Sequence, residues 1–225
     1  MPTREEWAVV LFTLRVAALG TAMILPLGVA AAALLAGRHG PGRTILDTVF
    51  SLPLVLPPTA VGVVLLDVFA RASPLGRVLA DAGIEIAFDW KGVVLATSVM
   101  SFPLLVRSAL TAFEEVDPRL VGLARTLGCG PLQAFFRVTL PLAWRGVLAG
   151  TVLAFARALG EFGATVMLAG NIPGRTQTLA LAIFHEAQIG HDDRARVLAG
   201  VTAVLAFVAL WSAEVVGRAR TRRAA

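Results

Sequence analysis

The stretch EEVDPRLVGLARTLGCGPLQAFFRVTLPLAWRG, residues 114–146, lies between two strongly apolar runs but carries too many charges to cross a bilayer. Pro118 suits the first turn of a helix, and Asp117 before it is a residue type that caps helix N-termini. Apolar residues then recur at helical spacing and predict one apolar face. They are Leu120, Leu123, Ala124 and Leu127.

A second short helix is expected after a break. Gly128 and Gly130 interrupt the first helix, and Pro131 is well placed to begin the next one. Leu132, Phe135 and Phe136 supply its apolar side before Leu140-Pro141 leads into the following apolar run. An elbow of two helices with exposed apolar residues is typical of a docking surface, here over residues 113–141.

The sequence outward from this elbow is that of a membrane protein. The chain has 225 residues, of which 57% are hydrophobic and 16% are charged, whereas an ordinary soluble domain is about 45–50% apolar and about 25% charged. A bilayer core of about 30 Å needs about 20 helical residues. Apolar runs of this size predict a single all-α transmembrane domain over residues 1–225 with about five spans. The spans are expected at about 16–37, 46–68, 91–107, 144–169 and 196–216.

The first span is too long for the apolar region of a signal peptide, and Glu5 and Glu6 do not suit the start of one. We therefore expect it to remain as a helix. Residues 6–15 are expected to lie along the outer membrane interface, with Trp7 as an anchor.

The distribution of basic residues predicts the orientation. With the N-terminus outside and the C-terminus inside, most arginines fall in the cytoplasm, as the positive-inside rule requires. These arginines are Arg38, Arg43, Arg107, Arg119, Arg125, Arg137, Arg145, Arg218, Arg220, Arg222 and Arg223. The net charge of +5 is thus an orientation signal, and no nucleic-acid partner is expected.

Sequence motifs for catalysis and for metal or cofactor binding are missing. No Gly-Lys pair occurs, which excludes a phosphate-binding P-loop, so any ATP chemistry must come from another chain. His185-Glu186 begins like a zinc-protease helix, but Ile189 stands where the second His is needed. Cys129 is the only cysteine, which excludes an internal disulfide and a thiolate metal cluster. We expect neither enzyme activity nor a resident cofactor or metal in this chain.

Two features inside the predicted spans have a structural and a functional reading. Arg157 and Glu161 share one helix face at i and i+4; a structural ion pair is favoured over a role in moving an anion. Pro57 and Pro58 interrupt the second span, and this irregularity fits equally a packing kink or the border of a translocation pathway.

The pattern Ala124-x-x-x-Gly128-x9-Val138-x-Leu140-Pro141 resembles the cytoplasmic "EAA" loop of ABC importer permeases. In that family the loop docks into a cleft of a separate ATPase subunit. The resemblance assigns the docking role here to Asp117, Leu120, Leu123, Ala124, Thr126, Leu127, Gly128, Gly130, Phe135, Leu140 and Pro141. Gly122 and Leu123 depart from the family pattern, which has Glu and Ala at these two positions.

Three further segments resemble molybdate permease subunits, so the resemblance covers nearly the whole chain. They are SLPLVLPPTAVGVVLL (residues 51–66), FDWKGVVLATSVMSFPLLVRSALTAFEEVD (88–117) and AFARALGEFGATVMLAGNIPGRTQTL (154–179). Tungstate and sulfate permeases share this layout. Phe162 favours molybdate over sulfate, because sulfate permeases tend to carry Tyr there.

The resemblance implies the transmembrane subunit of an ATP-driven molybdate importer in the bacterial inner membrane. It also implies a homodimer of this chain, two ATP-binding cassette subunits that hold ATP and Mg, an extracytoplasmic oxyanion-binding protein, and surrounding membrane lipid. Residues 176–187 are expected to form a short helix near the external mouth. The alternatives are a tungstate or sulfate ABC permease and, less favoured, a secondary carrier that works without an ATPase.

Overall fold

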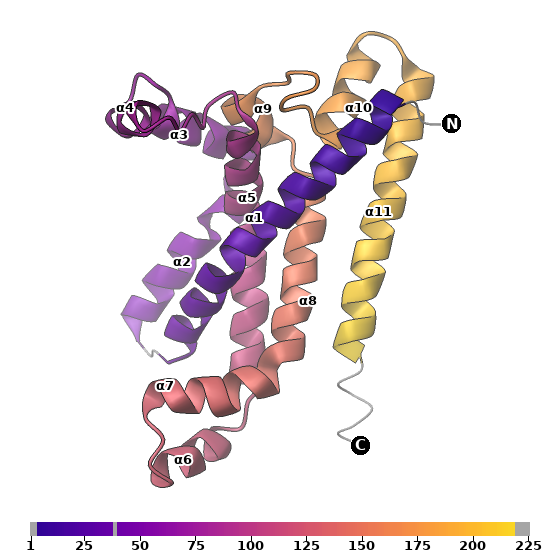
Figure 1. Ribbon diagram of the computed structural model, residues 1–225. Helices are drawn as coiled ribbons and strands as arrows, with labels where there is room; N and C mark the ends of the chain where they lie inside the picture. Colours follow the sequence, from indigo (N-terminus) through magenta and orange to yellow (C-terminus); the bar gives the residue numbers. More distant parts are fainter. Residues whose placement is uncertain (1–3, 38–39, 219–225) are drawn as a thin grey trace.

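The computed structural model describes residues 4–37 and 40–218, and all regular secondary structure in this part of the chain is helical (Figure 1). Four segments are long and apolar enough to cross a membrane, and a bent helix pair makes a fifth if it is counted as one span. The all-helical membrane fold predicted from the sequence is therefore confirmed. The four segments are α1 (Arg4–Ala36), α5 (Trp90–Glu114), Pro131–Leu159, which ends in α8 (Leu140–Leu159), and Asp192–Ser212 within α11 (Asp192–Arg218).

Helix α1 is one continuous helix of 33 residues that crosses the bundle obliquely (Figure 1). Residues 6–15, expected at the outer interface, are the first part of the same helix that forms the first span, and the helix passes through Arg15 without a break. Arg15 lies on the exposed side of α1, while Val10 and Thr13 on the other side are buried. A charge ends an apolar run in the sequence, but it does not interrupt the backbone hydrogen bonds of a helix.

Helices α1 and α5 form the centre of the bundle and pack closely through glycines. A Cβ added to Gly20 would lie 2.9 Å from the Ser98 Oγ, and one added to Gly28 would lie 2.7 Å from the Leu105 Cδ2. Small residues at such contacts let two membrane helices approach until their backbones nearly touch.

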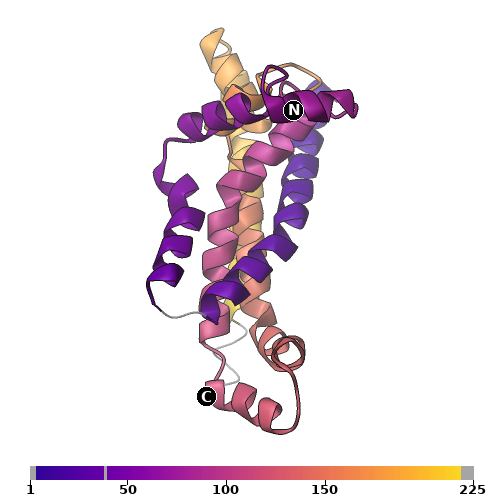
Figure 2. The ribbon, with the colours of Figure 1, turned by 90° about the vertical axis from the view of Figure 1, so that its left-hand side faces the viewer.

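The second predicted span, residues 46–68, is not one helix. The chain instead forms α2 (Pro41–Val55) and α3 (Pro58–Phe69), which meet at an angle of 107°. Pro57 and Pro58 cause the break, because neither has an N–H to continue the helical hydrogen bonds. Helix α3 and the following α4 (Pro74–Asp81) lie across one end of the bundle (Figures 1 and 2).

The fourth predicted span, residues 144–169, is also broken. Helix α8 ends at Leu159, residues 160–162 are not helical, and α9 (Gly163–Ala169) follows in a different direction (Figure 1). Helix α9 packs against α3 and α5, so the two broken spans meet at the same end of the bundle.

The two ends of the bundle carry different elements. The start of α1, the α3–α4 pair and α10 (Leu179–Gln188) lie at one end (Figure 1). Helices α6 (Pro118–Thr126) and α7 (Pro131–Ala134) lie at the other, beyond the C-terminal end of α5. The short helix expected over 176–187 is thus present as α10. It begins at Leu179, whose N–H donates to the Thr13 Oγ of α1 over 2.9 Å.

Candidate functional site

The elbow predicted over residues 113–141 is formed by α6, α7 and the turns beside them, and we call it the elbow below. Helix α6 begins as the sequence predicts. The Asp117 Oδ1 accepts the N–H of Arg119 over 2.9 Å, and Pro118 occupies the first turn. This cap supplies a partner for one of the N–H groups that a helix start leaves unpaired.

Gly128 ends α6 in a backbone conformation that favours glycine. Its φ is +89°, in the left-handed region. The N–H of Cys129 donates to the Ala124 carbonyl and that of Gly128 to the Arg125 carbonyl, both over 3.1 Å. These two bonds define a Schellman motif, which turns the chain sharply from α6 toward α7.

The passage from α7 into α8 has a feature that the sequence analysis missed. The helix does not stop at Leu140-Pro141; it continues through a π-helical turn, Phe135–Thr139, in which the Leu140 N–H reaches the Phe135 carbonyl. Pro141 then lies in the first turn of α8. Neither residue type nor spacing marks this turn in the sequence.

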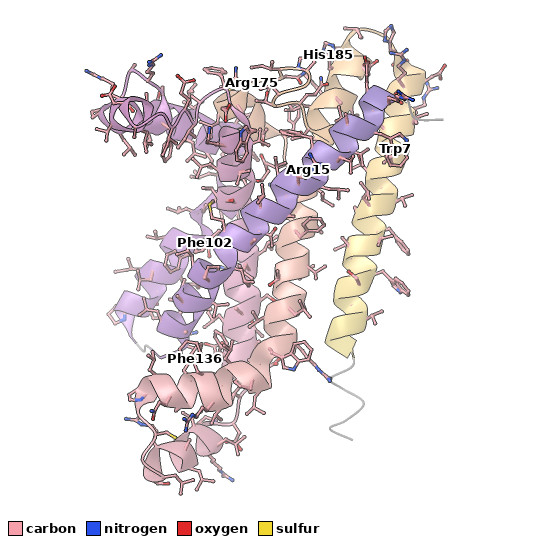
Figure 3. All side chains as sticks on the ribbon, in the orientation of Figure 1. Trp7, Arg15, Phe102, Phe136, Arg175 and His185 are labelled. Carbon is pink, nitrogen blue, oxygen red and sulfur yellow. The ribbon has the colours of Figure 1, made fainter. Side chains whose placement is uncertain are left out.

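The apolar residues of the elbow divide into two groups. Leu123, Leu127 and Leu132 are 60%, 78% and 72% exposed. Phe135 instead packs edge-on against Phe113 of α5, with ring centroids 5.4 Å apart. The other predicted residues divide in the same way. Phe136 (labelled in Figure 3) and Leu120 are exposed. Ala124 and Leu140 are half-buried, and the Thr126 hydroxyl donates to the Leu123 carbonyl.

A groove of about 580 Å³ lies between the elbow and the ends of α1 and α5, and Gly122 is one of its lining residues. A Cβ added to Gly122 would have nothing within 4 Å, so the structure has open space where the EAA pattern has Glu. An ion pair between Arg43 of α2 and Glu114 of α5 borders the groove. The sequence analysis did not single out this pair, because nothing in the spacing relates two residues 71 positions apart.

The four residues predicted to border a pathway come from the two broken spans, and the structure brings these breaks together. Pro57 and Pro58 begin α3, and Gly163 begins α9. A Cβ added to Gly163 would lie 2.8 Å from the Pro58 Cβ. One turn further along α3, a Cβ added to Gly62 would lie 2.8 Å from the Ala164 Cα.

Arg157 and Glu161 form an ion pair, with 2.7 Å between the Arg157 Nη1 and the Glu161 Oε2. The Glu161 side chain is only 1% exposed, while that of Arg157 is 29% exposed. The other carboxylate oxygen of Glu161 accepts the N–H of Ala164 over 2.8 Å. Both oxygens of this buried carboxylate therefore have partners, one on each side of the α8–α9 break.

A second charged cluster lies at the opposite end of the bundle from the elbow. Asp89 caps α5 through the Lys91 N–H, and it pairs with the Lys91 Nζ and with Arg175, whose Nη2 lies 3.2 Å from its Oδ2. Burial acts to raise the pKa of Asp89, but the hydrogen bonds and positive charge of Lys91 and Arg175 outweigh it and lower the pKa. This cluster too was missed, because Arg175 is remote from Asp89 in the sequence.

The arrangement holds no metal-binding group of His, Cys, Asp or Glu within residues 4–37 and 40–218. It has an elbow with exposed apolar residues at one end and two helix breaks in contact with each other toward the other end. Comparison with known proteins indicates what such an arrangement serves.

Residues 24–221 match the family described as "Binding-protein-dependent transport system inner membrane component". The molybdenum transport system permease protein ModB of Escherichia coli strain K12 is 46% identical over 224 residues, which are 99% of this chain and 98% of that protein. The sulfate transport system permease protein CysT of Salmonella typhimurium is 36% identical over 172 residues, 76% of this chain and 62% of CysT.

Solved structures show the same fold at low sequence identity. A bacterial alginate ABC transporter, in complex with a periplasmic protein that binds an alginate pentasaccharide, has a chain that matches with a TM-score of 0.75 and 18% identity. The match covers 97% of this chain and 80% of that one. The MetNI methionine ABC transporter in inward-facing conformations matches with a TM-score of 0.70 and 17% identity, over 96% and 94% of the two chains.

Proposed function

Because this chain belongs to the family of binding-protein-dependent transport system inner membrane components, we propose that it is the transmembrane subunit of an ATP-driven molybdate importer. It is a multi-pass inner membrane protein. Molybdate is favoured over sulfate because ModB aligns along nearly the full length of both chains, whereas CysT aligns over a shorter part and at lower identity.

The observation that carries the proposal is the exposed apolar face of the elbow. Leu123, Leu127 and Leu132 are exposed on the elbow, which lies beyond the C-terminal end of α5 (Figure 1). An apolar patch in water is typical of a surface that a partner protein covers. The partner is an ATP-binding cassette subunit that binds ATP and Mg, because this chain has no P-loop.

The charge of the elbow supports the predicted orientation, with the elbow in the cytoplasm, the N-terminus outside and the C-terminus inside. Basic residues gather at this end of the described chain: Arg43, Arg119, Arg125, Arg137 and Arg145. Arg38, Arg220, Arg222 and Arg223, which supported the same orientation in the sequence, lie outside the described residues.

The assembly comprises two copies of this chain, two ATPase subunits and one extracytoplasmic oxyanion-binding protein. The outer faces of α2 and α11 support a second copy and a lipid shell, because they are strongly apolar. Val55 of α2 is 82% exposed and Phe207 of α11 is 68% exposed. Such faces are stable only against lipid or another apolar surface.

The experiment is ATP-driven uptake in proteoliposomes that contain this chain, its ATPase and its binding protein. We expect ATP-dependent uptake of labelled molybdate that excess sulfate does not compete away. If unlabelled sulfate or tungstate inhibits this uptake at a lower concentration than unlabelled molybdate does, that anion and not molybdate is the substrate. Uptake driven by an ion gradient in vesicles without the ATPase would instead identify a secondary carrier.

A further inference from the structure

The α8–α9 break is held by one side chain, that of Glu161. Its Oε2 binds Arg157 of α8 and its Oε1 accepts the N–H of Ala164 in α9. The first N–H groups of a helix have no partner inside the helix, and at this site, where Glu161 is only 1% exposed, the protein itself has to supply one. Glu161 therefore fixes the direction in which α9 leaves the break.

Helix α9 in turn determines where α3 lies. Gly62 and Gly163 let the two helices approach so closely that an added Cβ would come within 2.8 Å of the opposing helix at either position. The contact is continuous with the buried cluster of Val61, Ala164 and Leu168. A shift of α9 is thus transmitted to α3 and to the α2–α3 break, because close-packed interiors move as units.

From this chain of contacts we infer that Glu161 is a positioning residue for transport: it holds the two helix breaks against each other and thereby fixes the shape of the pathway that they border. The inference rests on the proposed transport function. It assigns no contact with the anion to Glu161, whose two oxygens are already engaged.

Variants at residues 157 and 161 distinguish the hydrogen bond from the Ala164 N–H from the ion pair with Arg157. Glu161→Ala removes both bonds. The double variant Arg157→Met/Glu161→Gln removes the charge pair but leaves an amide oxygen to accept the Ala164 N–H. Asp193→Asn is the control, because it removes a carboxylate whose ion pair with Arg196 lies exposed at the surface.

Uptake and ATP hydrolysis are measured together, so that coupling is read as molybdate moved per ATP. Loss of the partner of the Ala164 N–H weakens the preference of α9 for its native direction by about 1.4 kcal/mol, a factor of ten, and we expect the ratio to fall by up to about tenfold in Glu161→Ala. The double variant and Asp193→Asn should stay close to the unmodified chain. An unchanged ratio in Glu161→Ala overturns the inference. A double variant as impaired as Glu161→Ala also overturns it, because the ion pair with Arg157, and not the hydrogen bond from Ala164, then accounts for the loss of coupling.

Gly62→Ala tests the same inference if Glu161→Ala does not fold. The added methyl group pushes α9 away from α3 while Glu161 stays intact, and the same loss of coupling is expected. Gly200→Ala is its control, because a Cβ there meets nothing within 4 Å. Normal coupling in Gly62→Ala overturns the inference.

A measurement without transport keeps this test separate from the proposed function. Spin labels at Val64 of α3 and Val166 of α9, in a Cys129→Ser background, report the distance between these helices. Glu161→Ala should broaden or shift this distance, while the double variant should leave it unchanged. A distance that does not respond to Glu161→Ala overturns the inference even if uptake fails in every form of the chain, and a failure of the unmodified chain to transport overturns only the proposed function.

Discussion

Pro58 and Gly163 lie in contact where the two broken helices of the bundle meet, and the contact leaves no room for a side chain at residue 163. A Cβ there would lie 2.8 Å from the Pro58 Cβ and 3.1 Å from the Thr59 backbone nitrogen. Neither neighbour is the far end of a flexible side chain, so a larger residue has to move backbone.

Gly163→Ala should therefore destabilise the protein. Overpacking of this kind costs about 1–3 kcal/mol, and we expect a lower thermal unfolding temperature in detergent. Gly160→Ala is the matched control three residues earlier, where a Cβ meets nothing within 4 Å and φ is −96°. Equal unfolding temperatures for the two variants would contradict the close contact of α3 with α9.

Gly128→Val should impair the elbow through its backbone conformation. Residue 128 has space for a side chain, but its φ of +89° disfavours every residue with a Cβ. The expected cost is about 1–2 kcal/mol, borne locally by the turn between α6 and α7, so ATPase binding should weaken in a pull-down. Gly200→Val is the control, because it makes the same change in α11, where φ is not positive and a Cβ again meets nothing within 4 Å. If both variants bind the ATPase equally well, the turn between α6 and α7 is not part of the docking surface.

The two groups of apolar residues in the elbow should respond differently to substitution. Leu127 is 78% exposed, so Leu127→Ser reduces the exposed apolar surface of the elbow without opening a cavity in the core. We expect weaker ATPase binding at unchanged stability. Phe135→Ala removes the ring that packs on Phe113. We expect it to cost about 2 kcal/mol of stability, below the value for a fully buried Phe because Phe135 is only half-buried. Thermal unfolding and ATPase pull-down of both variants check this, and a loss of stability in Leu127→Ser would show that Leu127 is part of the core.

Asp89→Asn should lower stability at neutral pH by about 0.5–1 kcal/mol, because Asn keeps the helix cap but loses the attraction to Lys91 and Arg175. The folded pKa of Asp89 lies below its ordinary value of 3.8. Its contribution is therefore complete above that pH and is lost as the pH falls through the folded pKa. Unfolding temperatures of the two proteins should differ at pH 7, begin to converge only below the ordinary pKa of 3.8, and coincide once the pH is below the folded pKa. A difference that grows with acidity would contradict this sign.

Cys129 provides a direct test of orientation, because it is the only cysteine and lies in the elbow. A membrane-impermeant maleimide should label it in inside-out vesicles and not in intact cells. Cys129→Ser supplies the background signal. Labelling in intact cells would place the elbow outside and reverse the orientation.

Hydropathy in the sequence predicted where the chain is apolar, but it could not predict where helices bend. Pro57 and Pro58 indicated irregularity in the second span, yet the 107° angle depends on the packing of α3 against α9. In the fourth span no proline marks the break. Glu161 in an apolar run was the available signal, and it was interpreted as half of an ion pair.

Periodicity likewise predicted both helices of the elbow but not which apolar residues stay exposed. Phe135 and Phe136 are adjacent and chemically identical, yet Phe135 packs on α5 and Phe136 is 57% exposed. Adjacent side chains of a helix point about 100° apart, so the two rings cannot share one face. Which of them is buried depends on how α7 lies against the end of α5, and periodicity in the sequence does not contain that information.

The passage from α7 into α8 has a mechanical consequence. Because the Leu140 N–H donates to the Phe135 carbonyl across the π-helical turn, α7 and α8 are joined without a break in the helical backbone. A displacement of α7 is therefore passed to the start of α8. The first contacts of α8 with α5 are the buried Ala143 and the Gly146 carbonyl, which accepts a hydrogen bond from the Ser108 hydroxyl over 3.3 Å, so such a displacement acts on α5 as well.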